Sequence, residues 1–277
     1  MSFSANPLRL AIVRAAAAIF CALTISSARA ANAPALSASE LAARLSAGRQ
    51  DGSSFVRLRL EVKPAGGAAK TTLQLQIKER RTKSATDIVY QVLWPRERKG
   101  EAVLLHKAAD SAPTGSLFIP PDSPRPIGAA QMKEPLFGSD LSYEDLIDNF
   151  FAWENQTITG TEIVDRVACQ ILESKPGKGE RTSYGSVRTW VDIRRLVPLR
   201  VEKYFASGEL ARRIDTTRVS TADNHRHVPA NMTVRRARGD SATDLDGSSI
   251  RHDVIYADRE FTPEGMKELS PPRSAPE

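Results

Sequence analysis

The chain is short of cysteine and of long apolar runs, and each shortage excludes a class of protein. It has two cysteines in 277 residues, too few for a small fold held together by disulfides. No segment beyond the first thirty residues is apolar over the roughly 20 positions needed to cross a bilayer. Apolar residues make up 41% and charged residues 26%, close to ordinary globular usage. The composition therefore predicts a folded, water-soluble domain rather than a disordered or fibrous chain.

The first thirty residues have the layout of a secretory signal peptide. Arg9 and Arg14 precede an apolar run, Ala15–Ile25, which is followed by the small-x-small triplet Ala28-Arg29-Ala30. This order of basic, apolar and small residues is typical of a leader cut after Ala30. The run is too short for a membrane anchor, and the bulky residues before Cys21 do not suit a lipid-modified cysteine. We expect residues 1–30 to be removed and the protein to be periplasmic.

The net charge is also small once the leader is removed. Without its three arginines the chain keeps 36 basic and 33 acidic side chains. A surplus of three does not favour nucleic acid, which needs a concentrated basic face. Cys169 is then the sole cysteine, so no internal disulfide forms. Its setting, V-A-C-Q-I-L, predicts a small buried strand residue rather than a nucleophile.

Alternating apolar and polar residues predict a chain made mostly of β-strands. Residues 56–62 and 73–78 alternate with period two and are joined by a P-A-G-G turn, which indicates a hairpin. Ser207-Gly208 and Asp246-Gly247 predict two further hairpin turns, and the five prolines of residues 120–135 predict an irregular crossing. Further strands are expected at residues 88–94, 102–106, 115–119, 158–165, 167–174, 186–193, 196–205, 209–220, 227–237 and 248–257.

Capping sequences predict a few short helices. Ser37 with Glu40, and Ser142 with Asp145, have the Ser-x-x-acid form of a capping box. Thr262-Pro263-Glu264 predicts a last short helix with proline at its first position. The Pro-rich tail from residue 270 to 277 is expected to fray.

These elements predict a mainly β fold, an unclosed half-barrel of about eleven antiparallel strands with short α-helices over its concave apolar face. If helices and sheet enclose a cavity, an acyl chain is the favoured ligand, because each methylene removed from water contributes about 0.8 kcal/mol. Alternation shows which residues share a face, not whether that face is hollow or packed, so a filled core is the open alternative. The candidate cavity residues are Val56, Leu58, Leu60, Leu73, Leu75, Ile77, Trp94, Leu146, Ile147 and Phe150.

One stretch carries a family resemblance. Residues 117–146 read L-F-I-P-P-D-S-P-R-P-I-G-A-A-Q-M-K-E-P-L-F-G-S-D-L-S-Y-E-D-L, and this stretch resembles the LolA-like outer-membrane lipoprotein-sorting proteins. The similarity continues through W-V-D-I-R-R-L-V-P-L-R-V-E-K-Y-F and F-T-P-E-G-M-K-E-L, so it implies one such domain over residues 31–269. The resemblance further implies an unclosed barrel and a periplasmic carrier whose cavity shields the acyl chains of lipoproteins or other lipids.

Possible catalytic and metal-binding residues have simpler interpretations. His225 and His227 could present two imidazoles, but zinc sites need three or four ligands, so solvated turn residues are expected. Glu144 and Asp145 point about 100° apart on a helix and are better explained as first-turn acids. Asp140 lies between two serines without a G-x-S-x-G elbow. We therefore expect no metal, no cofactor and no enzymatic activity.

Two functions from different classes are compatible with this sequence. The first is a monomeric carrier that takes a lipid or lipoprotein from an inner-membrane transporter and passes it to an outer-membrane acceptor. The second is an accessory domain that senses such a ligand and regulates an exporter or an envelope-stress regulator. A carrier should deliver its lipid, whereas a sensor should change its affinity for a partner. A hydrolase, the third alternative, would have to alter the lipid.

Overall fold

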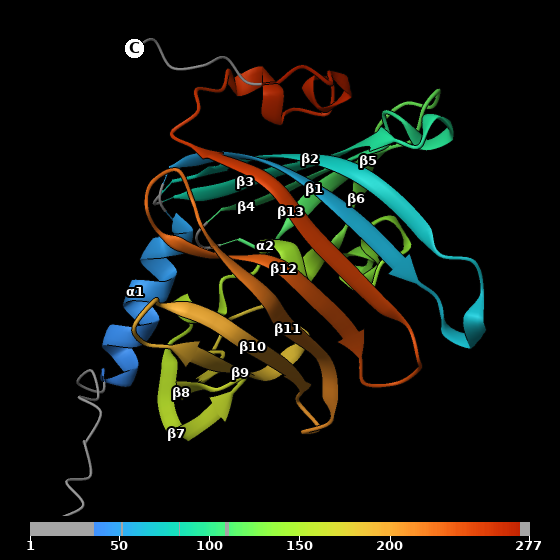
Figure 1. The fold of residues 1–277 in the computed structure, drawn as a ribbon. Helices are drawn as coiled ribbons and strands as arrows, with labels where there is room; N and C mark the ends of the chain where they lie inside the picture. The colour runs from blue at the N-terminus through green and yellow to red at the C-terminus, as the bar shows by residue number, and fades with distance from the viewer. Residues whose placement is uncertain (1–35, 51, 83, 109–110, 272–277) are drawn as a thin grey trace, which may run out of the picture. The chain divides into compact units, whose positions relative to one another are not determined.

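The computed structural model describes residues 36–50, 52–82, 84–108 and 111–271. Within this part, thirteen strands form one antiparallel sheet in the order β6-β5-β4-β3-β2-β1-β13-β12-β11-β10-β9-β8-β7, which does not close (Figure 1). The prediction of a mainly β, unclosed half-barrel is confirmed, with thirteen strands instead of about eleven. The expected signal peptide and the end of the expected tail lie outside the described residues.

Strands that follow one another in the chain are neighbours in the sheet, with the exception of β6 and β7, which form its two edges. The connection between them, residues 128–154, therefore has to cross the width of the sheet. The strands are β1 (Ser53–Lys63), β2 (Thr71–Arg81), β3 (Ala85–Trp94), β4 (Ala102–Ala108), β5 (Thr114–Phe118), β6 (Arg125–Ile127), β7 (Asn155–Val164), β8 (Val167–Lys175), β9 (Tyr184–Asp192), β10 (Val197–Phe205), β11 (Leu210–Thr221), β12 (His227–Arg236) and β13 (Ala242–His252).

Two α-helices are found in the described residues, α1 (Ala38–Gln50) and α2 (Tyr143–Ile147). Both predicted capping boxes are present. The Ser142 N–H donates to Asp145 Oδ2 at 2.8 Å, and the Asp145 N–H donates to Ser142 Oγ at 3.3 Å. Ser37 and Glu40 exchange the same two bonds before α1. None of the described helices has the length and apolar character needed to span a membrane.

The inner face of the sheet is covered by two apolar clusters. The first joins β1–β5 to the crossing segment through Leu136, Phe137, Tyr143 and Ile147. The second joins β8, β9 and β11 to α1 and to a 3₁₀ turn, Phe150–Ala152. The crossing segment thus contributes to both clusters, and α2 lies on the inner side of the curved sheet (Figure 1).

The opposite face of β3 and β4 is covered by the C-terminal segment, which the sequence did not predict. Val89 and Leu104 pack against Phe261 and Met266, whereas the alternate β3 residues belong to the first inner cluster. The predicted helix after Thr262 is a 3₁₀ turn, Gly265–Lys267, and Thr262 Oγ1 accepts the Gly265 N–H at 3.0 Å. The segment therefore covers the outer face of β3 and β4 without adding a strand to the sheet.

The predicted hairpin turn at Asp246-Gly247 is wrong. Both residues lie inside β13, where Gly247 pairs with Leu58 at a shift in the strand register. A β-carbon at position 247 would lie 2.9 Å from the Ala230 carbonyl oxygen. Glycine here permits a close approach of two backbones beside a bulge. The expected strand at residues 248–257 is replaced by β13, and the turn lies between β12 and β13 instead.

Candidate functional site

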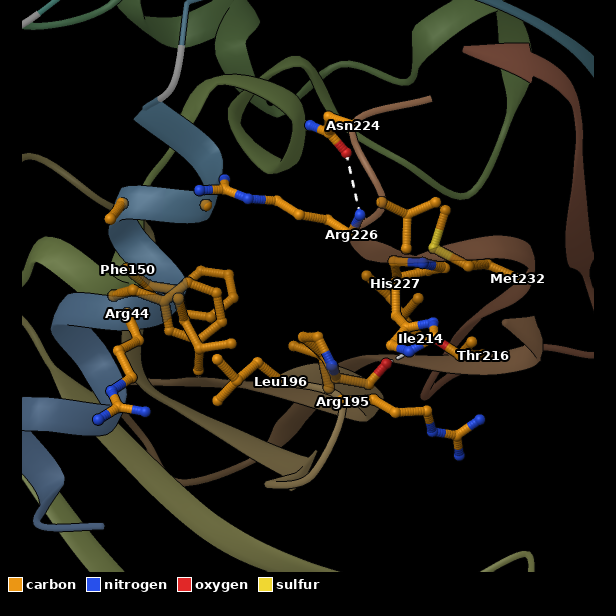
Figure 2. Close-up of a pocket in the computed structure, with 18 of the residues that line it drawn as sticks. Arg44, Phe150, Arg195, Leu196, Ile214, Thr216, Asn224, Arg226, His227 and Met232 are labelled. Atoms are coloured by element: carbon orange, nitrogen blue, oxygen red, sulfur yellow. Dashed lines mark hydrogen bonds between the residues drawn. The ribbon is translucent and has the colours of Figure 1, made fainter. Parts of the chain in front are cut away.

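A cavity of about 680 Å³ lies between α1 with the Phe150–Ala152 turn on one side and β10, β11 and β12 on the other (Figure 2). Its size is within the range of about 300–1,000 Å³ that is usual for small-molecule sites. Most of its walls are apolar. They are formed by Leu45, Ala47, Phe150, Phe151, Leu196, Pro198, Val201, Ile214, Val228, Pro229 and Met232.

Cationic and imidazole side chains gather where the β11–β12 turn meets the cavity. The turn is closed by a hydrogen bond from the Ala222 N–H to the Arg226 carbonyl oxygen at 2.8 Å, and Asn224 Oδ1 accepts the Arg226 N–H at 3.1 Å. Figure 2 shows Arg226 extending from this turn toward α1. The charged, imidazole and amide residues of the lining other than Asp145 and Lys203 are Arg44, Arg195, Asn224, His225, Arg226, His227 and His252.

The inner wall of the cavity contains a fully buried carboxylate, that of Asp145. Its Oδ1 accepts from Lys203 Nζ at 2.8 Å and from the Tyr184 hydroxyl at 2.7 Å, and its Oδ2 accepts from Arg212. The Asp145 side chain is 0% exposed and that of Lys203 is 1% exposed. Burial alone would raise the pKa of Asp145, but the charges of Lys203 and Arg212 outweigh burial and hold this pKa well below its ordinary value.

This carboxylate has no spare capacity for acid–base chemistry. In addition to the three donors named above, Ser142 donates to Oδ2 from its N–H and from its hydroxyl. The neighbouring Glu144 points elsewhere and accepts from the hydroxyl of Thr182 at 2.8 Å. The two adjacent acids therefore do not share a site, and Asp145 joins the crossing segment to β9, β10 and β11.

The predicted cavity residues are divided among three places. Three cross-strand pairs, Val56–Ile77, Leu58–Leu75 and Leu60–Leu73, lie together on β1 and β2. They belong to the first inner cluster, which also includes Ile147 and, partly buried at its edge, Leu146. Trp94, at the end of β3, is 49% exposed. Phe150 alone among the ten lines the cavity, and contact of any of them with a lipid stays a prediction.

Sequence reasoning missed the part of the cavity that β10–β12 and α1 supply. Val201, Ile214 and Met232 lie on strands that were predicted, and each has an apolar side chain at a position alternating with polar neighbours. Alternation could have placed them on a common face. It could not show that α1, more than 150 residues earlier in the chain, stands opposite them and leaves a space.

The histidines do not form a recognisable metal centre. His225 and His227 both line the cavity, and His252 is bonded to Asp223. Over the residues that the structure describes, no group of three or more histidine, cysteine, aspartate or glutamate side chains is arranged to hold a metal ion.

Cys169 is expected to react slowly with alkylating agents. The thiol packs with Val164, Trp190, Val197 and Leu199 and is 2% exposed. Burial, with a smaller contribution from Asp192, raises its pKa to about 11. Since the thiolate is the nucleophile, a shift from about 9 leaves roughly 100-fold less of it at pH 8. For a chain beginning at residue 31, iodoacetamide should modify the folded protein at least tenfold more slowly than the urea-unfolded protein. Equal rates would contradict the buried position.

Comparisons with known proteins support this fold. A family model described as "Uncharacterized protein" matches residues 84–268, and no curated protein sequence matches the chain. The chain resembles the crystal structure of a DUF1329 family protein from Desulfovibrio piger, with 23% identity, a TM-score of 0.76, and coverage of 83% of this chain and 97% of that one.

Two further solved structures share the architecture. One is described as an outer-membrane lipoprotein-sorting protein domain from Vibrio parahaemolyticus, with 20% identity, a TM-score of 0.74, and coverage of 83% and 98% of the two chains. The other is a LolA superfamily protein from Nitrosomonas europaea, with 18% identity, a TM-score of 0.65, and coverage of 82% and 98%. At these identities the likeness establishes the fold.

Proposed function

Since this chain belongs to the protein family whose model matches residues 84–268 and has a LolA-like fold, we propose that it is a periplasmic carrier of acyl chains. In this proposal residues 1–30 are a cleaved signal peptide, residues 31–269 are the LolA-like lipoprotein-sorting domain and residues 270–277 are a flexible tail. The mature protein binds the acyl chains of a lipoprotein or another lipid without covalent chemistry. It acts as a monomer between an inner-membrane donor and an outer-membrane acceptor.

The observation that carries the proposal is the apolar cavity between α1 and β10–β12. Leu45, Phe150 and Phe151 form one wall, and Val201 and Ile214 form part of the other. Such walls form no hydrogen bonds with a hydrocarbon chain. Each methylene that they remove from water contributes about 0.8 kcal/mol to the free energy of binding. An acyl chain is therefore the ligand class that this lining favours.

The test is loading followed by transfer. Protein 31–277 is mixed with vesicles that contain a fluorescent palmitoylated peptide, separated from them, and then mixed with empty acceptor vesicles. We expect a one-to-one soluble complex and delivery of the unaltered peptide to the acceptors. Binding without delivery would favour the sensing role, and a cleaved peptide would indicate a hydrolase. No soluble complex with any acylated probe would contradict the proposal.

A further inference from the structure

The cavity has a limited capacity. Its volume is about 680 Å³. A methylene group is close in size to a water molecule, whose share of liquid volume is about 30 Å³, so a chain of sixteen carbons needs roughly 480 Å³. Two such chains need roughly 960 Å³, more than the space between α1 and β10–β12. The cavity therefore has room for one long hydrocarbon chain.

Buried ionic contacts hold the inner wall of the cavity in place. Asp145, which lines this wall, is bonded to Lys203 on β10 at 2.8 Å and to Arg212 on β11. Five residues earlier in the crossing segment, Asp140 Oδ2 accepts from the hydroxyl of Thr243 on β13 at 2.8 Å. A cavity that widened past this wall would break these bonds and leave buried charges without partners, which is strongly unfavourable.

The half of the inner face beyond this wall is already filled by protein. Leu60 and Leu73, on β1 and β2, are fully buried in the first inner cluster. Leu136 and Ile147 of the crossing segment pack in the same cluster and are also buried. Protein interiors are packed about as densely as organic crystals. A second chain would therefore have to replace these side chains.

The wall formed by α1 is fixed as well. Leu41 and Leu45 are buried and pack in the second cluster together with Phe151. Just before α1, the Leu36 N–H donates to Gln170 Oε1 at 3.3 Å, and Gln170 Nε2 donates to the Leu36 carbonyl oxygen at 3.1 Å. A shift of α1 away from the strands would expose the two leucines and break both bonds. The cavity therefore does not widen readily on this side either.

We propose that the cavity holds one hydrocarbon chain at a time, so that its ligand is a single-chain amphiphile: a fatty acid, a lysophospholipid or a peptide with one acyl group. This inference rests on the proposed carrier function and specifies its ligand class. The chain lies between Phe150, on the side of α1, and Ile214, on the side of the strands (Figure 2). A diacyl phospholipid or a triacylated lipoprotein leaves at least one chain in water, and the methylenes of that chain contribute nothing to binding.

The first test counts the chains that the cavity holds. Protein 31–277 is saturated with palmitate below its micelle concentration, and native mass spectrometry gives the number bound. Val201→Trp combined with Met232→Trp fills the cavity from β10 and β12, so the palmitates lost in this variant are those that the cavity holds. We expect one to be lost. Ile163→Trp, at an exposed position of β7, is the control and should lose none. Loss of two or more in the folded cavity variant would overturn the inference.

The second test compares one short peptide that carries either one or three palmitoyl groups. Each form is diluted from detergent into wild-type protein 31–277, and the soluble complex is quantified by native mass spectrometry. We expect a one-to-one complex with the singly acylated peptide and at least tenfold less complex with the triacylated one. Equal loading of the two peptides would overturn the inference.

These results also separate the inference from the function on which it rests. Uptake of two or more palmitates by the cavity, or full loading of the triacylated peptide, overturns the one-chain inference and leaves the carrier function intact. Absence of uptake of palmitate and of both peptides overturns both. If uptake is limited to one chain, the tightest binder among palmitate, palmitoyl lysophosphatidylcholine and the singly acylated peptide identifies the head group.

Discussion

Replacing Asp145 with asparagine is expected to lower the free energy of unfolding by about 3–5 kcal/mol, the usual cost of removing one partner from a buried ion pair. The carboxylate is 0% exposed, and Lys203, its partner at 2.8 Å, is 1% exposed. The variant would leave the Lys203 ammonium group buried without a counter-charge. Because the Asp145 side chain also accepts hydrogen bonds from the Tyr184 hydroxyl and from the Ser142 N–H before α2, the change should loosen the crossing segment. Urea denaturation of protein 31–277 measures the loss.

A second substitution tests whether the loss of stability comes from the unpaired charge of Lys203. Lys203→Met added to Asp145→Asn removes the stranded cation, so the double variant should recover part of the lost free energy of unfolding. Asp246→Asn is the matched control, because its ion pair with Arg59 is exposed on both sides and such pairs contribute about 0–1 kcal/mol. Equal losses for Asp145→Asn and Asp246→Asn would contradict a structural role for the buried network.

The same network predicts that the stabilities of wild type and Asp145→Asn become more alike at acid pH. The pKa of Asp145 is lower in the folded protein than its ordinary value near 4. Its contribution to stability is therefore complete above that ordinary value and is lost as the pH falls toward the folded pKa. The gap in unfolding free energy between wild type and Asp145→Asn should narrow below about pH 4.

Filling the cavity should abolish most lipid binding while the protein stays folded. Val201→Trp and Met232→Trp each place a large ring in the space opposite α1, where both residues are half-buried and line the cavity. A ring that keeps two methylenes of the ligand in water costs about 1.6 kcal/mol of binding free energy. We expect at least a tenfold loss of affinity for palmitate, measured by titration calorimetry.

The control places the same ring outside the cavity. Ile163, on the edge strand β7, is 72% exposed, so Ile163→Trp should bind palmitate as the wild type does. Circular dichroism and thermal melting should show all three variants folded. Unchanged palmitate affinity in both cavity variants would mean that lipid binds elsewhere, for example against the first inner cluster.

Local elements were predictable where the contacts that determine them lie close together in the sequence. The capping boxes of Ser37 and Ser142 lie within three residues of their partners, and the Ser207-Gly208 turn joins adjacent strands, as the hydrogen bond from the Phe205 N–H to the Glu209 carbonyl oxygen shows. Gly247 shows the limit of such reasoning. An Asp-Gly pair suits a turn, but here glycine is needed because the backbone of Ala230, on the neighbouring strand, leaves no room for a β-carbon.

The cavity was less predictable than the fold, because it depends on where distant segments come together. Period-two alternation placed Leu60 and Leu73 on one face, and the structure shows that face packed against Tyr143 and Ile147. Alternation is equally present in β10 and β11, where α1 leaves space. Which half of the sheet is filled is decided by the path of the crossing segment, and that path is set by long-range contacts such as Lys203 with Asp145.

The most direct test of the carrier proposal is the native mass of the protein as a cell makes it. The full chain, including the proposed leader at residues 1–30, is expressed in a double-membraned bacterium, purified from the periplasm without detergent and examined by native mass spectrometry with lipid extraction. We expect the mass of residues 31–277 plus one stoichiometric acylated species, and loss of that species in Val201→Trp. A bare polypeptide mass that takes up no lipid or acylated peptide on incubation would contradict the carrier function.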